Sequence, residues 1–254
     1  MEVHAHTHTP RKKWTHYFWE FLMLFLAVFC GFLAEYQLEH KIEKHRAKEY
    51  ALSLYRDLTA DTLAFNQTIS NLNICTRNID TLITLLGKKE ELPKNTKNIY
   101  RLSIYAFIFP QNRPNESTLQ QLLNSGSLRY FRSNELIDTI KNYVTEIQLF
   151  NEFRDDIGNM NIEFRKVQAR VLEINPLINA TSYNGFLNRQ NVLYDSLDFT
   201  EQTQLVTSDT LLIKEYANWC ALKKFYMANT SAKIYRLKLR AIGVLQVLKD
   251  EYHF

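Results

Sequence analysis

The sequence predicts an all-α protein in which one N-terminal transmembrane helix continues into an elongated antiparallel bundle of long helices. Glycine and proline are scarce, with six and five copies among 254 residues, so the chain lacks the tight turns that β-rich and nucleotide-binding folds need. An uncharged apolar run lies near the N-terminus. Farther along, apolar residues recur at heptad spacing through long stretches without proline, which is typical of helices that pack together.

Several classes of functional site are excluded by residue spacing. Gly158 and Gly185 are the two closest glycines, which rules out a G-x-G-x-x-G loop and a P-loop. No histidine lies between Arg46 and Tyr252, so the main body has neither Ser-His-Asp nor Cys-His catalysis and no His-rich metal site. Basic residues outnumber acidic ones by only 31 to 27, less than a nucleic-acid binder shows. We therefore expect no enzyme, no cofactor and no nucleic-acid partner.

Residues 14–34 form the predicted transmembrane helix. The run Phe21 to Ala34 has no charged residue, and it reaches the ~20 residues of a bilayer span when its aromatic flank is added. Nine large apolar residues contribute about −3 to −5 kcal/mol to insertion, against about 3 kcal/mol at most for Glu20. The residues expected at the membrane interface are Arg11, Lys12, Lys13, Trp14, Tyr17 and Trp19.

This segment is expected to remain as an anchor, because Phe32 occupies a position where a signal-peptide cleavage site needs a small residue. The basic run before the span places residues 1–13 in the cytoplasm and the body, residues 35–254, outside. The lipid bilayer is thus the first expected partner. Ala27 and Gly31, four residues apart, would let two such helices approach closely, so self-association in the membrane is an open alternative.

The body is predicted to contain three long helices, at about 35–87, 134–174 and 209–252. Phe65, Leu72, Ile79 and Leu86 mark the buried stripe of the first. The stripe of the second is Leu136, Tyr143, Phe150, Ile157, Phe164 and Val171. That of the third is Leu212, Trp219 and Tyr226, followed after an eight-residue step by Ile234, Ala241 and Leu248. The step predicts a local register change.

The connections between these helices are less regular. Residues 88–132, with short helices at 96–109 and around 119–123, are expected to cap the far tip so that the second long helix returns toward the membrane. Asn175-Pro176 is expected to end that helix. Residues 175–208 would then lie near the membrane as a long connection without obvious elements.

Few residues are candidates for binding chemistry. His4, His6 and His8 alternate with small residues and are weak candidates for a transition-metal site, because a flexible tail without fixed geometry holds a metal weakly; a solvated cytoplasmic tail is the simpler explanation. Arg129 and Arg132 suit an anion or partner site near a helix start, and an ordinary interhelix corner is the alternative. Cys75 and Cys220 either pair in an oxidising compartment or remain free buried thiols.

Two segments of the chain are distinctive: AEYQLEHKIEKHRAKEY, directly after the span, and LLNSGSLRYFRSNELIDTIKNYV in the middle of the chain. Together with the basic start and the single span, they resemble an uncharacterised family of single-span bacterial envelope proteins that carry a domain of unknown function. The likeness covers residues 14–60 and 118–145, including Leu122 to Gly126 and Ser133 to Val144. It implies a bacterial membrane protein, and it implies no activity, cofactor or catalytic residue.

Three functions remain open at this level. The first is a non-enzymatic scaffold or accessory subunit of an envelope complex, with other membrane or envelope proteins or a second copy as partners. The second is an extracytoplasmic sensory or ligand-binding module that works with a separate signalling subunit. A carboxylate-dependent hydrolase is the third. A pocket at Arg129 or in the 175–208 connection would favour the sensor, and a solid core with an exposed apolar stripe would favour the scaffold.

Overall fold

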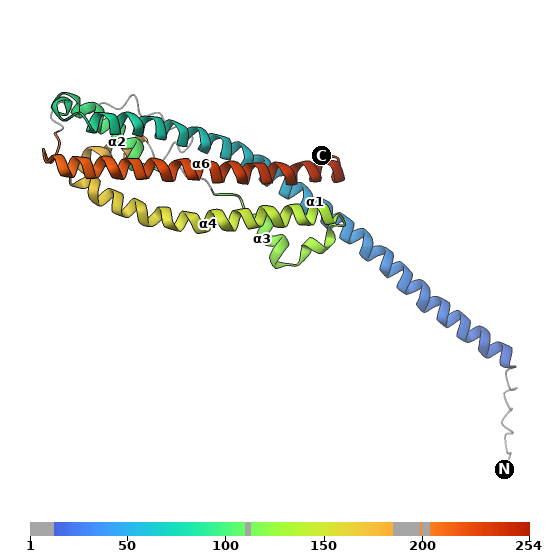
Figure 1. The fold of residues 1–254 in the computed structure, drawn as a ribbon. Coiled ribbons are helices and arrows are strands. Elements are labelled where there is room, and N and C mark those ends of the chain that lie inside the picture. Colours follow the sequence, from blue (N-terminus) through green and yellow to red (C-terminus); the bar gives the residue numbers. More distant parts are fainter. Residues whose placement is uncertain (1–12, 110–112, 185–198, 200–203) are drawn as a thin grey trace, which may run out of the picture. The chain divides into compact units, whose positions relative to one another are not determined.

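The computed structural model describes residues 13–109, 113–184, 199 and 204–254. Within these ranges the chain consists of helices and their connections, and one isolated bridge between Leu172 and Leu205 is the sole β-type pairing, which confirms the all-α prediction. The helices are α1 (Trp14–Leu86), α2 (Thr96–Phe107), α3 (Ser117–Asn124), α4 (Asn134–Ala169), α5 (Ile174–Asn184) and α6 (Thr210–Tyr252) (Figure 1).

The chain divides into two compact units, Met1–Glu49 and Tyr50–Phe254, and α1 contributes to both. We call them the N-terminal unit and the bundle unit. In the described part of the N-terminal unit nearly every side chain of α1 is exposed. From Ala51 onward the same helix buries a continuous stripe of side chains. The part of α1 in the N-terminal unit is therefore unpacked, and the part in the bundle unit is packed.

The buried stripe of α1 in the bundle unit alternates steps of three and four residues without interruption. Its members are Ala51, Leu54, Leu58, Asp61, Phe65, Thr68, Leu72, Cys75, Ile79, Leu82 and Leu86. This spacing keeps one face of a helix turned to its neighbours. The expected anchors Phe65, Leu72, Ile79 and Leu86 are confirmed. The positions between them are filled by Thr68, Cys75 and Leu82, and the polar Asp61 continues the stripe before Phe65.

Helix α4 runs parallel to α1, so the expectation that the second long helix returns from the tip is wrong. The Tyr143 hydroxyl, early in α4, lies 3.5 Å from the Asp61 carboxylate, and the same carboxylate accepts from the backbone N–H of Asn115. Residues 88–132 therefore lead the chain back from the Leu86 end toward the Tyr50 end. The turn-rich sequence of this segment did not reveal its direction.

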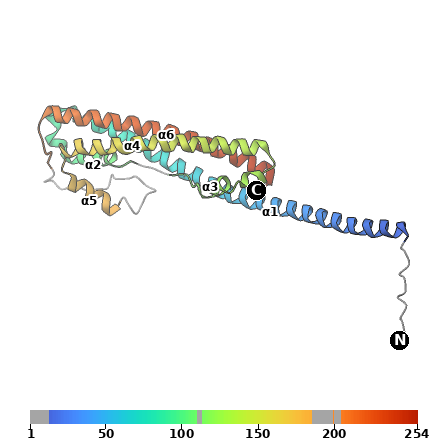
Figure 2. The same ribbon diagram turned by 90° about the horizontal axis from the view of Figure 1, so that it is seen from below.

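Helix α6 runs antiparallel to α4, and the two lie side by side in both views (Figures 1 and 2). At one end, the Gln168 side chain donates to the Tyr216 hydroxyl. At the other, the rings of Phe131 and Tyr252 are 6.3 Å apart. Residues 175–208 consequently begin and end at the Leu86 end of the bundle unit. There the Tyr100 hydroxyl donates to the carbonyl oxygen of Gln204 at 2.8 Å.

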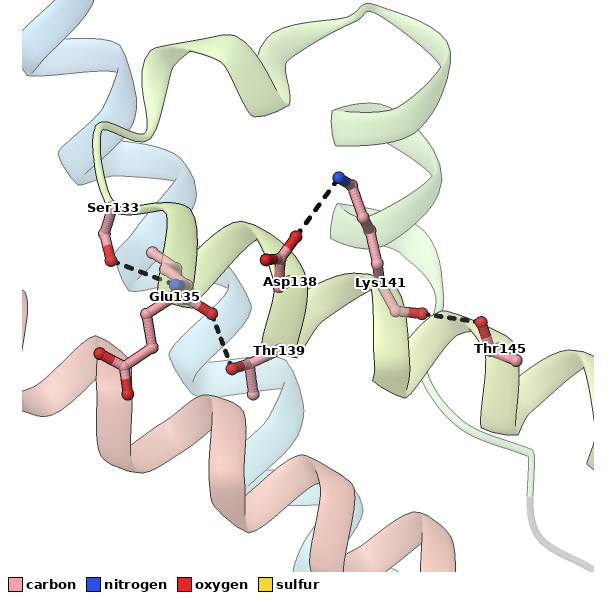
Figure 3. A network of polar contacts seen from close by, with 7 residues as sticks. Ser133, Glu135, Asp138, Thr139, Lys141 and Thr145 are labelled. Atoms are coloured by element: carbon pink, nitrogen blue, oxygen red, sulfur yellow. Dashed lines mark hydrogen bonds and ion pairs between the residues drawn. The ribbon is translucent and has the colours of Figure 1, made fainter.

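The start of α4 shows how local chemistry fixes a helix boundary (Figure 3). The Ser133 hydroxyl accepts from the backbone N–H of Leu136 at 3.1 Å, which satisfies a donor that the first helical turn leaves unpaired. Asp138 and Lys141 form an ion pair at 3.5 Å one turn later. The six apolar residues expected to form the second stripe, Leu136 to Val171, are all buried.

The end of the second long helix differs from the expectation. Helix α4 stops at Ala169, and Asn175-Pro176 lies in the first turn of α5 instead of terminating α4. Proline is well tolerated there because the first N–H groups of a helix have no intrahelical acceptor. Part of the 175–208 connection is therefore helical.

The third stripe is continuous, and the expected register change is wrong. Leu212, Trp219 and Tyr226 are only half-buried. The core positions of α6 alternate steps of three and four residues: Ile213, Tyr216, Cys220, Lys223, Met227, Thr230, Ile234, Leu237, Ala241, Val244 and Leu248. The apparent step arose because Leu212, Trp219 and Tyr226 are large apolar residues that directly precede core residues. The hydrophobic pattern therefore placed the first half of the stripe one residue too early.

Candidate functional site

The N-terminal unit contains a helix segment that is long and apolar enough to cross a membrane, and none of that segment is buried. Trp14, Tyr17 and Trp19 are 81%, 55% and 61% exposed, and Phe21 and Phe32 are 65% and 68% exposed. Exposing such side chains to water is costly. Lys13 is exposed beside them, whereas Arg11 and Lys12 lie outside the described residues.

Ala27 and Gly31 lie on an open part of this helix. Both are exposed, and a Cβ added at Gly31 would meet nothing within 4 Å. The two residues therefore leave room for a neighbouring helix. His4, His6 and His8, the metal candidates, lie outside the described residues. Among the residues that the structure describes, no group of three His, Cys, Asp or Glu side chains is placed to hold a metal ion.

Arg129 and Arg132 flank the corner before α4, and both are exposed. Arg129 belongs to a short 3₁₀ turn, Ser127–Tyr130, and its guanidinium lies 5.4 Å from the ring centre of Tyr130. Phe131, between the two arginines, is 3% exposed. The buried ring anchors the corner while the arginines stay in solvent, so the local geometry is that of an interhelix corner.

A buried lysine inside the bundle unit is the most unusual feature of the structure. Lys223, at a core position of α6, is 1% exposed. Its ammonium group donates to the Asn161 side-chain oxygen on α4, and it lies 5.0 Å from the ring centre of Phe164 and 5.1 Å from that of Phe109. The amide and the two ring faces are the favourable contacts that offset its removal from water.

Two thiols lie within electrostatic reach of this lysine. Cys75 of α1 and Cys220 of α6 are both 0% exposed and both free. Of the two expectations, a disulfide or free buried thiols, the structure therefore shows free buried thiols. The Cys220 thiol adjoins a buried polar network in which the Tyr216 hydroxyl donates to Ser103 at 3.1 Å and accepts from Gln168 at 3.0 Å.

Burial controls the protonation of these groups. Burial, assisted by the nearby Arg165 guanidinium, lowers the pKa of Lys223 from 10.5 to about 7. It raises the pKa of both the Cys75 and the Cys220 thiol to about 12, although the Lys223 ammonium acts in the opposite direction. At neutral pH the thiols are protonated and poorly nucleophilic, and the lysine amine is close to half-protonated.

This arrangement holds a buried charge but does not present it to a substrate. A catalytic amine or thiol must reach the reacting atom, and the exposed fractions of Lys223, Cys75 and Cys220 leave no access from solvent. The cluster joins α1, α4 and α6 at one level of the bundle unit. Its direct effect is on the stability of the bundle.

A second polar cluster ties the segment before α3 to α1. The Asp61 carboxylate, 5% exposed, accepts from the Asn115 backbone N–H at 3.0 and 2.9 Å. Asp57, one turn earlier, accepts from the Thr118 hydroxyl at 2.6 Å and from the Asn115 side chain at 2.8 Å. Burial raises the pKa of Asp61 from 3.8 to about 6, while the bond from Asn115 lowers it.

Sequence reasoning missed both clusters. Asp61 and Lys223 lie at positions that complete an uninterrupted alternation of three and four residues, and that spacing was the signal available to find them. A search restricted to apolar residues passes over it. The spacing cannot, however, say that Asn161 or Asn115 supplies the partner, because those contacts join helices far apart in sequence.

Comparisons with family models, with curated proteins and with solved structures gave no match to this chain. The resemblance to bacterial envelope proteins thus remains an expectation from two sequence segments. What is established is a helical bundle preceded by an apolar helix that can span a membrane.

Proposed function

We propose that this protein is a single-pass, membrane-anchored helical-bundle protein of the bacterial inner membrane that acts as a non-enzymatic scaffold or accessory subunit of an envelope complex. The observation that carries the proposal is the apolar helix of the N-terminal unit, none of which is buried in the described structure. A bilayer removes that surface from water, and its Trp and Tyr side chains suit the lipid interface.

The interior of the bundle unit supports a scaffold. Each of its three long helices contributes a buried stripe, and the buried titratable groups Lys223, Cys75 and Cys220 have no access from solvent. A pocket at Arg129 would have favoured a sensory module, and Arg129 is exposed at a corner. The outer face of α6 carries exposed apolar side chains, as a protein that binds other proteins requires.

Membrane insertion is tested with charged substitutions in the apolar helix. A Leu26→Arg/Phe29→Arg double variant loses the favourable terms of two residues and adds about 5 to 7 kcal/mol, more than the whole segment supplies. We expect wild type in the membrane fraction after alkaline carbonate washing and the variant outside it. Leu63→Arg/Leu149→Arg, at exposed positions of the bundle unit, is the matched control. Wild type that is soluble without detergent would refute the proposal.

The proposed orientation has a separate test. The basic residues before the helix place the N-terminus in the cytoplasm and the bundle unit outside. Protease added to spheroplasts should then digest the chain beyond residue 35, with a cytoplasmic marker protein intact in the same sample. Full protection of the bundle unit would reverse the orientation and leave the anchor itself standing.

A further inference from the structure

The outer face of α6 carries a second heptad pattern that nothing in the described structure covers. Its apolar members, which we call the outer seam, are exposed and alternate steps of three and four residues: Ala221, Phe225, Ala228, Ala232, Tyr235, Leu239 and Ile242. Phe225 and Tyr235 are 61% and 51% exposed, and Leu239 and Ile242 are 49% and 43% exposed. Such spacing lines one side of a helix with knobs for another helix.

The other two long helices of the bundle unit have no such face. On the outer side of α4, exposed Leu149 and Ile162 stand among Glu152, Asp155 and Asn159. On the outer side of α1, Leu63 stands alone among polar residues. An isolated apolar side chain on a surface needs no explanation, but a run of seven at helix-packing spacing indicates an interface.

We propose that the outer seam binds the outer seam of a second copy of this chain, with the two α6 helices antiparallel. The sizes of the seam side chains determine which residues of the two helices face each other. When Ala232 lies opposite the second copy's Tyr235, Ala228 lies opposite Leu239 and Phe225 lies opposite Ile242. Every seam residue from 225 to 242 then has a partner, and each alanine faces a large side chain. This inference rests on the proposed scaffold function, and it identifies the partner as a second copy of the chain.

A parallel arrangement fits the same residues poorly. It would stack Ala228 on Ala228 and Ala232 on Ala232 in neighbouring layers, between wide layers of Phe225 and Tyr235. The separation of the helices would have to change between layers, leaving gaps that close packing does not tolerate.

The flanks of the outer seam permit the antiparallel pair. In this register Arg236 lies opposite Asn229 of the second copy, and Lys238 lies opposite Ser231, so no two basic side chains face each other. Arg236 is also ion-paired within its own chain, at 3.1 Å from Glu146. The like charges of α6 therefore do not oppose the contact directly.

The area is that of a reversible dimer. A covered aromatic side chain buries about 150–250 Å², so the exposed fractions of Phe225 and Tyr235 amount to about 200 Å² in each copy. With the aliphatic seam residues, two copies cover on the order of 1,000 Å², at the low end for a specific interface. We expect association that depends on protein concentration.

Cysteine cross-linking of the full chain in detergent tests the register. All chains carry Cys30→Ser. Chains with one tag also carry Ala228→Cys, and chains with a second tag carry Leu239→Cys. These two positions lie opposite each other in the proposed pair. Two Ala228→Cys chains, by contrast, would have these residues about 16 Å apart along the helix, beyond the reach of a disulfide. We expect a two-tag product from the mixed pair and none from the Ala228→Cys pair. The reverse result would establish a parallel register and overturn the proposal.

Loss of the dimer tests the surface itself. Ala232→Glu places two acidic groups near the two-fold axis, and Leu63→Glu, at an exposed position of α1, is the matched control. Sedimentation in detergent should show a dimer dissociation constant raised at least about tenfold by Ala232→Glu and unchanged by Leu63→Glu, with helical circular dichroism constant in both. A dimer that survives Ala232→Glu but is lost in Gly31→Leu would assign the contact to the membrane helix and overturn the proposal.

Two further outcomes separate this inference from the proposed function. In the first, wild type is monomeric and a fluorophore attached to the Leu239→Cys variant responds only to anionic vesicles. This result would assign the outer seam to lipid and overturn the proposed dimer, and the membrane anchor would be unaffected. A full chain that is soluble without detergent and still dimerises would refute the membrane anchor alone.

Discussion

Replacing the buried lysine with methionine, Lys223→Met, should stabilise the bundle unit at neutral pH. Methionine has a similar length and suits an apolar core. It removes a group whose ammonium form is held 1% exposed among the Phe164 and Phe109 rings and the Cys75 and Cys220 thiols. It also leaves the Asn161 side-chain oxygen without its donor, which offsets part of the gain.

The magnitude follows from the pKa of the lysine. Its value is 10.5 in the unfolded chain and about 7 in the folded one, a difference worth about 5 kcal/mol when both states are compared well below pH 7. Between these values the unfolded chain binds more protons, so wild-type stability rises with pH. The rise should be about 2 kcal/mol from pH 7 to 9. After the loss at Asn161, Lys223→Met should gain about 1–3 kcal/mol at pH 7.

Urea unfolding of the full chain in mild detergent, followed by circular dichroism at pH 7 and pH 9, measures both effects. The matched control is Lys224→Met, the neighbouring lysine, which is 40% exposed and ion-paired with Asp80 at 2.6 Å. An exposed pair contributes about 1 kcal/mol or less, and its removal should leave the dependence on pH unchanged. If Lys223→Met retained the wild-type rise between pH 7 and 9, or lost stability at pH 7, the reasoning about this site would be wrong.

Three other substitutions test the fold. Phe150→Ala, at a residue 2% exposed, should lower the free energy of unfolding by about 3–5 kcal/mol. Leu149→Ala next to it, at a residue 43% exposed, should lower it far less. Equal losses would contradict the assigned stripe. The pKa of Asp61 is raised to about 6, so the folded chain binds more protons than the unfolded one between about pH 4 and 6, and wild-type stability falls as the pH rises through this range. Asp61→Asn should remove about 2 kcal/mol of that fall. An unchanged dependence of stability on pH would be inconsistent with a buried carboxyl. Ser133→Ala should cost about 1 kcal/mol through the lost helix cap, whereas Ser133→Thr, which keeps the hydroxyl, should cost far less; equal costs would contradict the assigned cap.

Most of the helical content was predictable, because its signals are local. The apolar stripe from Leu136 to Val171, which is confirmed, depends on residues only a few positions apart, as does the capping hydroxyl of Ser133 at the start of α4. The apolar helix of the N-terminal unit was predictable for the same reason, since its length and lack of charge are properties of one continuous segment.

The direction of α4 was not predictable in this way. Whether residues 88–132 turn at the tip or run back along the bundle depends on contacts such as Asp61 with Asn115, which join positions 54 residues apart. Hydrophobic periodicity reports which face of a helix is buried and does not distinguish a neighbour that runs parallel from one that runs antiparallel.

The sequence by itself determined that this chain forms long helices, where they begin and that one of them is suited to a bilayer. Each of these properties follows from backbone hydrogen bonds and side-chain polarity within a few turns. Only the tertiary structure decided that Lys223 and Asp61 occupy core positions and that the outer seam of α6 is left uncovered. Whether a residue is buried depends on which helices surround it, and that arrangement is a property of the packed chain as a whole.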